Sequence, residues 1–312
     1  MSTFPMIDHV ERYLALRRAM GFDLGIAGGQ LMQFARFAQS SDAGSLTVDV
    51  AIAWANSARH PTPLTSARRI EVIRPFAKYL RQVDPAAEVP ERNLFGRPHR
   101  RLTPHIFTTT EIEQLLAAAA RLPPAGGLRP IAYQTLFGLI AATGLRLGEA
   151  VRLELDDVDW VAGTLTVRRT KFHKSRRLAL HRTTLEHLSR CVEQRGRSVS
   201  AKSRFFVGDR GTALNVDTVE DVFQKLRTEL GWRPRGGHRA VRIHDLRHTF
   251  ITRRLADWQA NGTQIDQATL ALSTYVGHAK ITDTYWYLTA IPELMQAASV
   301  RFQKLAQGDD HD

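Results

Sequence analysis

The segment that most constrains the fold of this chain is residues 131–143, in which nearly every side chain is apolar. A helix that is apolar on all faces must be covered on all sides, so this segment predicts a central buried helix with other elements packed around it. Gly144 ends the segment, and the charged Arg146 follows almost at once. An arginine in such a place costs free energy unless it meets an anion or a paired acid. The pattern therefore predicts a helical core with a positively charged group held at its edge.

The rest of the chain reads mainly as helices with a small sheet, and 312 residues suffice for two domains. Helical periodicity is seen at 6–20, 30–38, 48–58, 64–83, 112–121, 147–153, 216–230, 244–258, 267–275 and 292–306. Residues 164–169 and 176–181 alternate and predict a β-hairpin with a basic loop. We expect a mainly α fold with a small β-sheet. A helical domain (1–84) is followed by a basic linker (85–104) and an α+β domain (105–312) that ends in helix 292–306.

Residues at the helix ends refine these boundaries. Thr47 and Thr108 stand where N-capping residues are expected, and Glu111 is placed to complete a capping box with Thr108. Glycines at 25–29 punctuate the chain before the second helix, and Pro75 either kinks the fourth helix or marks its start. Helices are therefore expected to begin just after these two threonines.

The charge of the chain indicates its partner. Lys and Arg number 43 against 31 Asp and Glu, a formal net charge of +12 that points to nucleic acid, with a merely basic surface as the alternative. The single cysteine, Cys191, cannot form an internal bridge, as is expected in a reducing compartment. No signal peptide is visible, and the longest uncharged run, 130–145, is too short for a membrane span. We expect a cytoplasmic protein that binds DNA and not membranes.

Basic residues that could contact DNA lie in the fourth helix, the linker and the hairpin loop. A basic linker is either a solvated tether or a segment that lies along a phosphate backbone, and both interpretations stay open. The candidate residues are Arg68, Arg69, Arg97, Arg100, Arg101 and Lys174.

Two segments of the second domain place arginines beside acid or imidazole groups. Glu149 lies one helical turn after Arg146 and can orient its guanidinium, as it would in an ordinary surface ion pair. His244, Arg247 and His248 fall on one face of a helix. Such a face suits a phosphate clamp with acid–base groups attached, while zinc binding and a structural helix start are the alternatives.

Two further segments carry a tyrosine and a lysine of interest. Tyr287 follows His278 in a run of aromatic residues, and a tyrosine near basic groups either acts as a nucleophile or simply packs in the core. Lys171 opens the hairpin loop, from which an ammonium group either reaches a leaving oxygen or stays solvated. Each segment alone has an ordinary structural explanation, so it is their order along the chain that points to one chemistry.

The order arginine, lysine, His-x-x-Arg, histidine, tyrosine resembles the catalytic domain of the tyrosine recombinases, the phage-integrase family. The matching segments are TGLRLGE around Arg146, TKFHKSRRLAL around Lys171, HDLRH at 244–248, GH at 277–278 and Tyr287, and together they cover about residues 105–300. The helices and basic linker at 1–104 are similar to the family's core-binding domain, without a specific motif. The interval between Arg247 and His278 is longer than in the commonest members of the family, and in this the chain resembles the branch encoded by bacterial mobile elements.

The resemblance implies a site-specific recombinase that cleaves and rejoins double-stranded DNA through a 3′-phosphotyrosyl intermediate, with no ATP, metal or other cofactor. It implies catalytic roles for Arg146, Lys171, His244, Arg247, His278 and Tyr287, with Glu149 and His248 in support. It also implies a tetramer on two DNA sites, assembled through helix 292–306, with sister recombinases of the same element as further partners.

Several assignments stay open at this point. The hairpin loop lacks the family's usual glycine, so the catalytic lysine is either Lys171 or Lys174, and Tyr285 is the alternative to Tyr287. A DNA-binding accessory protein without cleavage and a type IB topoisomerase are the alternative functions. The DNA target and the kind of rearrangement depend on side-chain placement that a sequence does not give.

Overall fold

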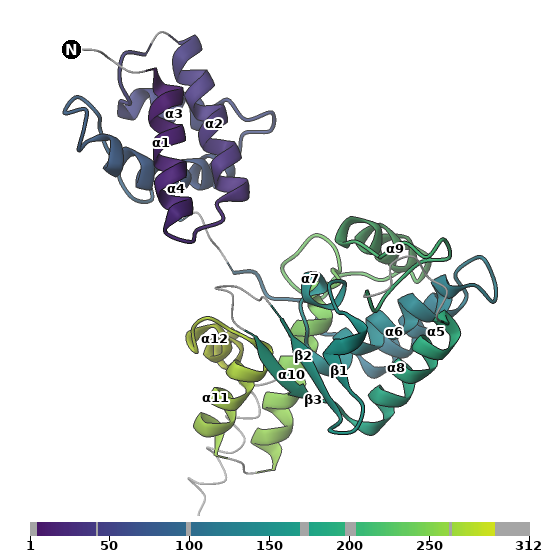
Figure 1. The fold of residues 1–312 in the computed structure, drawn as a ribbon. Helices are drawn as coiled ribbons and strands as arrows, with labels where there is room; N and C mark the ends of the chain where they lie inside the picture. The colour runs from purple at the N-terminus through teal and green to yellow at the C-terminus, as the bar shows by residue number, and fades with distance from the viewer. Residues whose placement is uncertain are drawn as a thin grey trace, which may run out of the picture. The chain divides into compact units, whose positions relative to one another are not determined.

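The computed structural model describes residues 5–41, 43–97, 101–168, 175–196, 204–261 and 264–290. The chain divides into two compact units, Met1–Arg101 and Leu102–Asp312, and each has an apolar core of its own. The first unit is purple to blue in Figure 1 and the second runs from teal to yellow. Together they form a mainly helical structure with one small sheet, as the sequence predicts.

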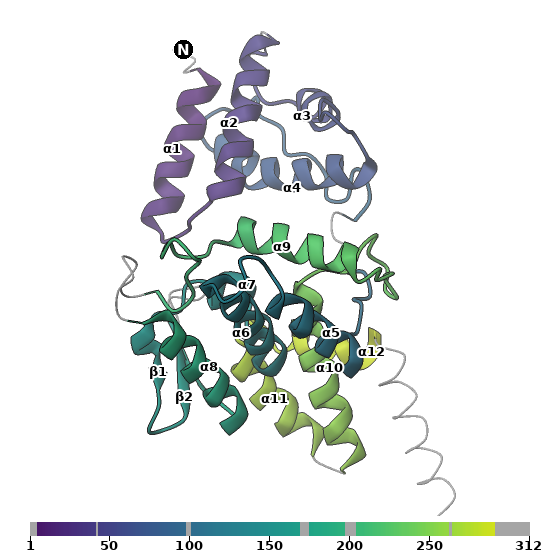
Figure 2. The same ribbon diagram turned by 90° about the vertical axis from the view of Figure 1, so that its right-hand side faces the viewer.

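The described part of the first unit contains four helices: α1 (Met6–Ala19), α2 (Gly25–Ser40), α3 (Val48–Asn56) and α4 (Pro63–Leu80). Within this unit α1 packs along α2, and α3 packs across α4 (Figure 2). The rings of Phe34, Trp54 and Phe76 are buried among them and meet edge to face. The predicted cap at Thr47 is confirmed, because its hydroxyl accepts a hydrogen bond from the backbone N–H of Val50.

Two details of the first unit differ from the sequence prediction. α2 begins at Gly25, so the glycines at 25–29 do not interrupt it. Gly28 is buried within this helix, and a Cβ there would make only an ordinary contact, 3.4 Å, with Leu14 of α1. Pro75 lies inside α4 and does not mark its start, which is at Pro63 with Thr62 as the cap.

The first half of the predicted linker folds onto the first unit. Ala87 is buried in its core, the Glu88 carboxylate accepts a hydrogen bond from the N–H of Val48, and Arg74 donates to the carbonyl of Pro90. This half of the predicted linker is therefore packed on the core of the first unit and is not a solvated tether. Apolar side chains at 87, 89 and 95 have a core to join, which outweighs the prolines around them.

In the second unit, α6 (Leu128–Thr143) is the central helix. It packs against α5 (Thr109–Ala120), α8 (Arg182–Arg195) and α10 (His244–Ala260), and most of its side chains are buried, which confirms the predicted core helix (Figure 2). Gly144 ends it in the left-handed conformation, with φ of +65°. The predicted capping box of Thr108 and Glu111 is also present.

The small sheet has three antiparallel strands in the order β1 (Val158–Asp159), β2 (Thr164–Val167) and β3 (Arg176–Ala179). The predicted hairpin is confirmed, with Leu165 opposite Leu178 and both buried. β1 follows a short 3-10 turn at Leu155–Asp157. Loop residues 169–174, and with them Lys171 and Lys174, lie outside the described residues.

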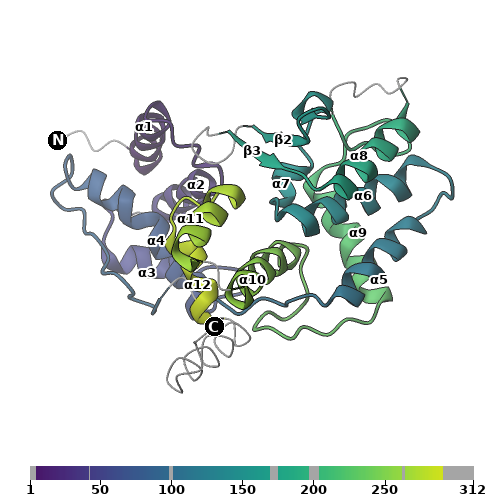
Figure 3. The same cartoon turned by 90° about the horizontal axis from the view of Figure 1, so that it is seen from below.

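The remaining described helices are α7 (Leu147–Ala150), α9 (Val216–Glu229), α11 (Ile265–Val276) and α12 (Thr282–Ala290). α11 packs against β3, α10 and α12, and this group lies on the side of the strands away from α8 (Figures 1 and 3). α8 and α12 are helices that the sequence analysis did not predict. None of the helices that the structure describes is long and apolar enough to cross a bilayer, and the expected helix 292–306 falls outside the described residues.

Candidate active site

Arg146 is held at the edge of the core just past the end of α6. Its Nη1 donates to Glu149 at 2.9 Å and its Nη2 donates to the carbonyl of Gly277, also at 2.9 Å. These two bonds fix the guanidinium plane while 36% of the side chain stays exposed. The predicted orienting role of Glu149 thus agrees with the geometry, and one face of the cation remains accessible.

Arg247 is a buried arginine whose hydrogen bonds go to carbonyl groups. It lies on α10, is 2% exposed, and donates to the carbonyls of Gly144 at 2.6 Å and Val276 at 2.9 Å. Burial, and then the positive charge of Arg146, lower the pKa of its guanidinium to about 9. Two cations that destabilise each other in this way form a site that an anion would stabilise.

Glu149 balances part of this charge. Its side chain is 3% exposed, and it is paired with Arg146 and with Arg176 of β3, whose Nη2 lies 2.8 Å from Oε2. Burial alone would raise the pKa of Glu149, but the hydrogen bonds and charge of Arg176 and then Arg146 lower it to about 2. Arg176 was not singled out from the sequence, because its partners are far from it along the chain.

The Tyr287 phenol lies in the same cluster. Tyr287 is 3% exposed on α12, and its hydroxyl lies 2.7 Å from Nδ1 of His248. The His278 ring stacks parallel to the tyrosine ring at 6.4 Å between centroids, and His278 Nδ1 lies 2.7 Å from the hydroxyl of Thr284. The predicted tyrosine is therefore brought together with both histidines.

The two histidines of α10 are kept neutral by their surroundings. Their rings meet edge to face at 4.8 Å. His244 is accessible, yet it stands among many protein atoms, and this loss of water together with the charges of Arg247 and Arg242 lowers its pKa to about 4. Burial, followed by the neighbouring His244 and Arg242, lowers the pKa of His248 to about 2. The residue that touches the Tyr287 hydroxyl is His248, which the sequence analysis placed in a supporting role, with the catalytic role given to His244.

Other predicted residues lie elsewhere or outside the described chain. The Tyr285 hydroxyl donates to Asp266 of α11 at 3.1 Å and not to the cluster of Tyr287. Arg69 donates to the carbonyl of Trp54 at 2.6 Å, so it holds α4 to α3. Arg68, Arg97 and Arg101 are exposed, and Arg100 is not among the described residues. Within the described ranges, no three His, Cys, Asp or Glu side chains are grouped to hold a metal ion.

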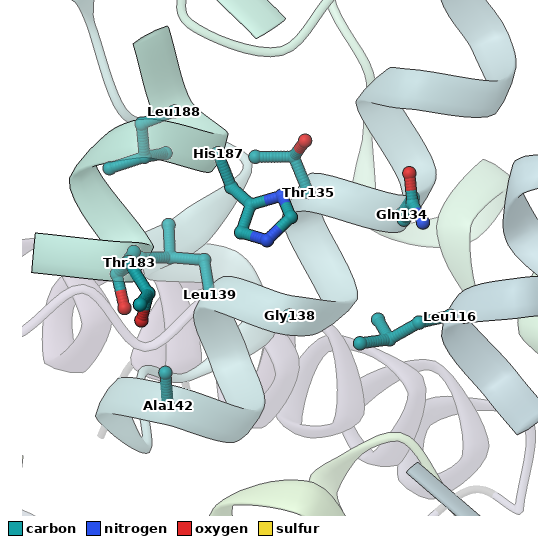
Figure 4. A pocket seen from close by; sticks show the side chains of 10 residues that line it. Leu116, Gln134, Thr135, Gly138, Leu139, Ala142, Thr183, His187 and Leu188 are labelled. Carbon is teal, nitrogen blue, oxygen red and sulfur yellow. The ribbon is translucent and has the colours of Figure 1, made fainter. Parts of the chain in front are cut away.

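A cavity of about 190 Å³ lies between α5, α6 and α8 (Figure 4). Its lining is mostly apolar, with Leu116 and Leu139 beside Thr135 and His187. It contains none of the arginines or tyrosines described above, so the cluster around Tyr287 is the candidate active site.

Comparison with known proteins places this cluster in a family. The model of the Phage integrase family matches residues 105–293, which include Arg146, Arg247, His278 and Tyr287. The chain belongs to the phage integrase family. A relative named as an integrase/recombinase, y4rB of Sinorhizobium fredii, is 36% identical, and the match covers 97% of this chain and 98% of that protein. The tyrosine recombinase XerC of Azotobacter vinelandii is 28% identical over 71% of this chain and 68% of its own length.

Solved structures share the fold. The Tn1549 transposon integrase in complex with transposon right end DNA has a TM-score of 0.67 at 16% identity and covers 96% of this chain and 99% of that one. The XerH recombinase bound to its difH substrate has a TM-score of 0.60 at 17% identity, covering 83% of this chain and 73% of that one. The protein is therefore a tyrosine-type site-specific recombinase that acts on DNA.

Proposed function

We propose that this recombinase cleaves and rejoins DNA strands through a covalent 3′-phosphotyrosyl intermediate in which Tyr287 is the nucleophile. The observation that supports this most directly is that the Tyr287 phenol on α12 lies in one cluster with the guanidinium groups of Arg146 and Arg247 and with the imidazoles of His248 and His278. The electrostatics of the site agree, because the negative charge of an ionised Tyr287 would raise the pKa of the nearby Arg247 guanidinium.

The two arginines bind the scissile phosphate. Their charges neutralise its non-bridging oxygens and stabilise the additional negative charge that develops as a fifth oxygen approaches phosphorus. Arg146 is exposed enough to contact the phosphate directly. Arg247 contributes its positive charge from inside the core. His278 donates a further hydrogen bond to the phosphate from its Nε2, with Nδ1 held by Thr284.

Cleavage makes one bond and breaks one. The Tyr287 oxygen bonds to phosphorus and gives its proton to His248, the bond from phosphorus to the 5′ oxygen breaks, and that oxygen takes a proton from Lys171 or Lys174. Because the phosphotyrosyl bond keeps the energy of the phosphodiester, a 5′ hydroxyl of another strand reverses the step without ATP. His248 holds the phenol in place, and His244 is the second imidazole that can pass the proton onward.

The natural reaction is proposed to be that of a mobile element. The likeness to the Tn1549 transposon integrase supports this assignment. By analogy with the lambda integrase dimer that is bound to a core site, we propose that protomers assemble on double-stranded DNA as a tetramer on two sites, with sister recombinases as possible partners. Helix 292–306 is proposed to join neighbouring protomers, so that removal of 291–312 abolishes recombination and spares binding to a single site.

The deciding experiment traps the covalent intermediate. Nicked suicide duplexes that tile the DNA flanking the protein's own gene are incubated with the full chain without metal ions, and adducts are resolved on a denaturing gel. Wild type and Tyr285→Phe are expected to form an adduct that maps to Tyr287, and Tyr287→Phe is expected to form none. An adduct that persists in Tyr287→Phe would move the nucleophile to Tyr285. Tight, salt-sensitive binding without any adduct would favour an accessory DNA-binding protein, and relaxation of supercoils without strand exchange would favour a topoisomerase.

A further inference from the structure

The last carbonyl groups of α11 each accept a hydrogen bond from a different arginine. The three bonds are Arg176 Nε to Tyr275 at 2.8 Å, Arg247 Nη2 to Val276 at 2.9 Å, and Arg146 Nη2 to Gly277 at 2.9 Å. The donors come from β3, from α10 and from the turn after α6. The end of one helix therefore sets the relative positions of three guanidinium groups that are distant in sequence.

Helix chemistry explains why this end attracts cations. The last carbonyls of a helix lack partners within the helix and carry partial negative charge. Gly277 ends α11 in the left-handed conformation, with φ of +70°, and its Cα lies directly under Arg176. A Cβ at this position would be 2.7 Å from Arg176 Nη1, so only glycine leaves room for the third arginine.

Arg176 differs from the other two arginines in having every nitrogen engaged by the protein. Nε donates to the Tyr275 carbonyl, while Nη1 and Nη2 donate to the two carboxylate oxygens of Glu149 at 3.1 and 2.8 Å. The side chain is 11% exposed. This geometry directs Arg176 towards Glu149, which in turn holds Arg146.

We propose that Arg176 is a positioning residue for the cleavage step, which it serves by locking Glu149 and through it the guanidinium of Arg146. This inference rests on the proposed function, since it assumes that Arg146 binds the scissile phosphate. Because Arg176 opens β3 directly after the hairpin loop, the same contacts tie the strand that follows Lys171 to the arginine pair. A lysine has one nitrogen and cannot make the fork to Glu149 and the bond to Tyr275 at once.

The first test compares Arg176→Gln with Arg177→Gln. Arg177 is the next residue of β3, is exposed, and loses the same charge, so it is a matched control. Single-turnover adduct formation is measured at saturating protein on a suicide duplex that wild type cleaves. Arg176→Gln is expected to cleave about 10- to 100-fold more slowly, because displacement of a catalytic group by about 1 Å costs on the order of 100-fold in rate. Its affinity for the duplex should stay within about 2-fold, and Arg177→Gln should cleave as wild type does at saturation.

A second readout separates positioning from a general loss of structure. A scissile phosphate with one non-bridging oxygen replaced by methyl is uncharged and depends less on Arg146. The rate defect of Arg176→Gln should therefore shrink to a few-fold on this substrate, whereas a misfolded site would be slow on both. The defects of Arg176→Gln and Glu149→Ala should not add in the double variant, because both act through the same contact.

Arg176→Lys covers the case in which Arg176→Gln does not fold, since it keeps the charge in the core and loses only the fork. It is expected to cleave at least 10-fold more slowly than wild type. Cleavage at the wild-type rate by either Arg176 variant would overturn this inference and leave the proposed function standing. So would rate defects of Arg176→Gln and Glu149→Ala that add fully in the double variant. Absence of any adduct from the wild-type chain would overturn the proposed function and the inference with it.

Discussion

His244 and His248 are imidazoles held neutral beside a site built for an anion. Burial and the neighbouring arginines disfavour their protonated forms and lower their pKa values to about 4 and about 2. A phosphate bound between Arg146 and Arg247 would offset those positive charges. The protonated imidazoles would then cost less, so DNA binding must raise both pKa values.

This gives a prediction for the free and bound protein. Titration of chain labelled with ¹³C-histidine should show His244 with a pKa near 4 in the free protein, and a higher pKa when a duplex is bound to Tyr287→Phe, which cannot cleave. His248→Gln assigns the resonances. A His244 pKa near the ordinary 6.5 in free protein, or one that falls when DNA binds, would contradict the electrostatic picture of the site.

The residues proposed to bind the phosphate could be predicted from the sequence, while those that hold them in place could not. Arg146, Arg247, His278 and Tyr287 stand in a recognisable order, and the structure brings them together. Arg176 has no sequence signal because its partners, Glu149 and Tyr275, are brought to it only by folding. The contact of His248 with the phenol likewise depends on how α12 docks on α10.

At the scale of elements, the C-terminal turn of α11 is where the site is assembled. Gly277→Ala would force an alanine into the left-handed region and push its Cβ against Arg176. We expect a loss of about 1–2 kcal/mol in the free energy of unfolding and a fall in cleavage rate of at least 10-fold. Denaturant unfolding and single-turnover adduct formation measure the two effects.

Gly163→Ala is the matched control for the backbone. Gly163 also has a positive φ, +63°, and a Cβ there meets only Leu185 at 3.4 Å, an ordinary contact away from the arginines. The Gly163→Ala variant should lose about as much free energy of unfolding as Gly277→Ala does, because both strain the backbone, and it should cleave at the wild-type rate. Equal rates for Gly277→Ala and wild type would show that the end of α11 does not control the arginines.

Helices and strands could be predicted from the sequence where their apolar residues form a clear pattern. α6 and the hairpin stood out because their patterns are almost fully apolar or strictly alternating. α8 escaped prediction because it buries few side chains, among them Leu188 and Cys191, on an otherwise polar helix. α12 was seen in the sequence only as a run of aromatic residues around Tyr287, and its helical form follows from packing against α10 and α11.

At the scale of the whole molecule, acid-sensitive groups gather in one of the two units. The described carboxyl and imidazole groups with lowered pKa values are Glu111, Glu149, His105, His238, His244 and His248, and all belong to the second unit. In each case the unfolded chain binds a proton at a higher pH than the folded chain does. Acid therefore favours unfolding of this unit, through the histidines below pH 6.5 and through the two glutamates below about pH 4.5.

The unfolding transitions of the two units should consequently occur at different temperatures when the protein is heated in mild acid. Each has its own core, so calorimetry of the full chain and of fragments 1–101 and 102–312 should give one transition per unit. Between pH 7 and pH 5 only the histidine part of the effect operates, and the Tm of the second unit should fall by several degrees more than that of the first. His248→Gln should reduce this fall, whereas replacement of His60, an exposed histidine of the first unit, should not. If the two transitions moved together, or if His248→Gln left the slope unchanged, the neutral imidazoles beside Tyr287 would not be what makes the catalytic unit sensitive to acid.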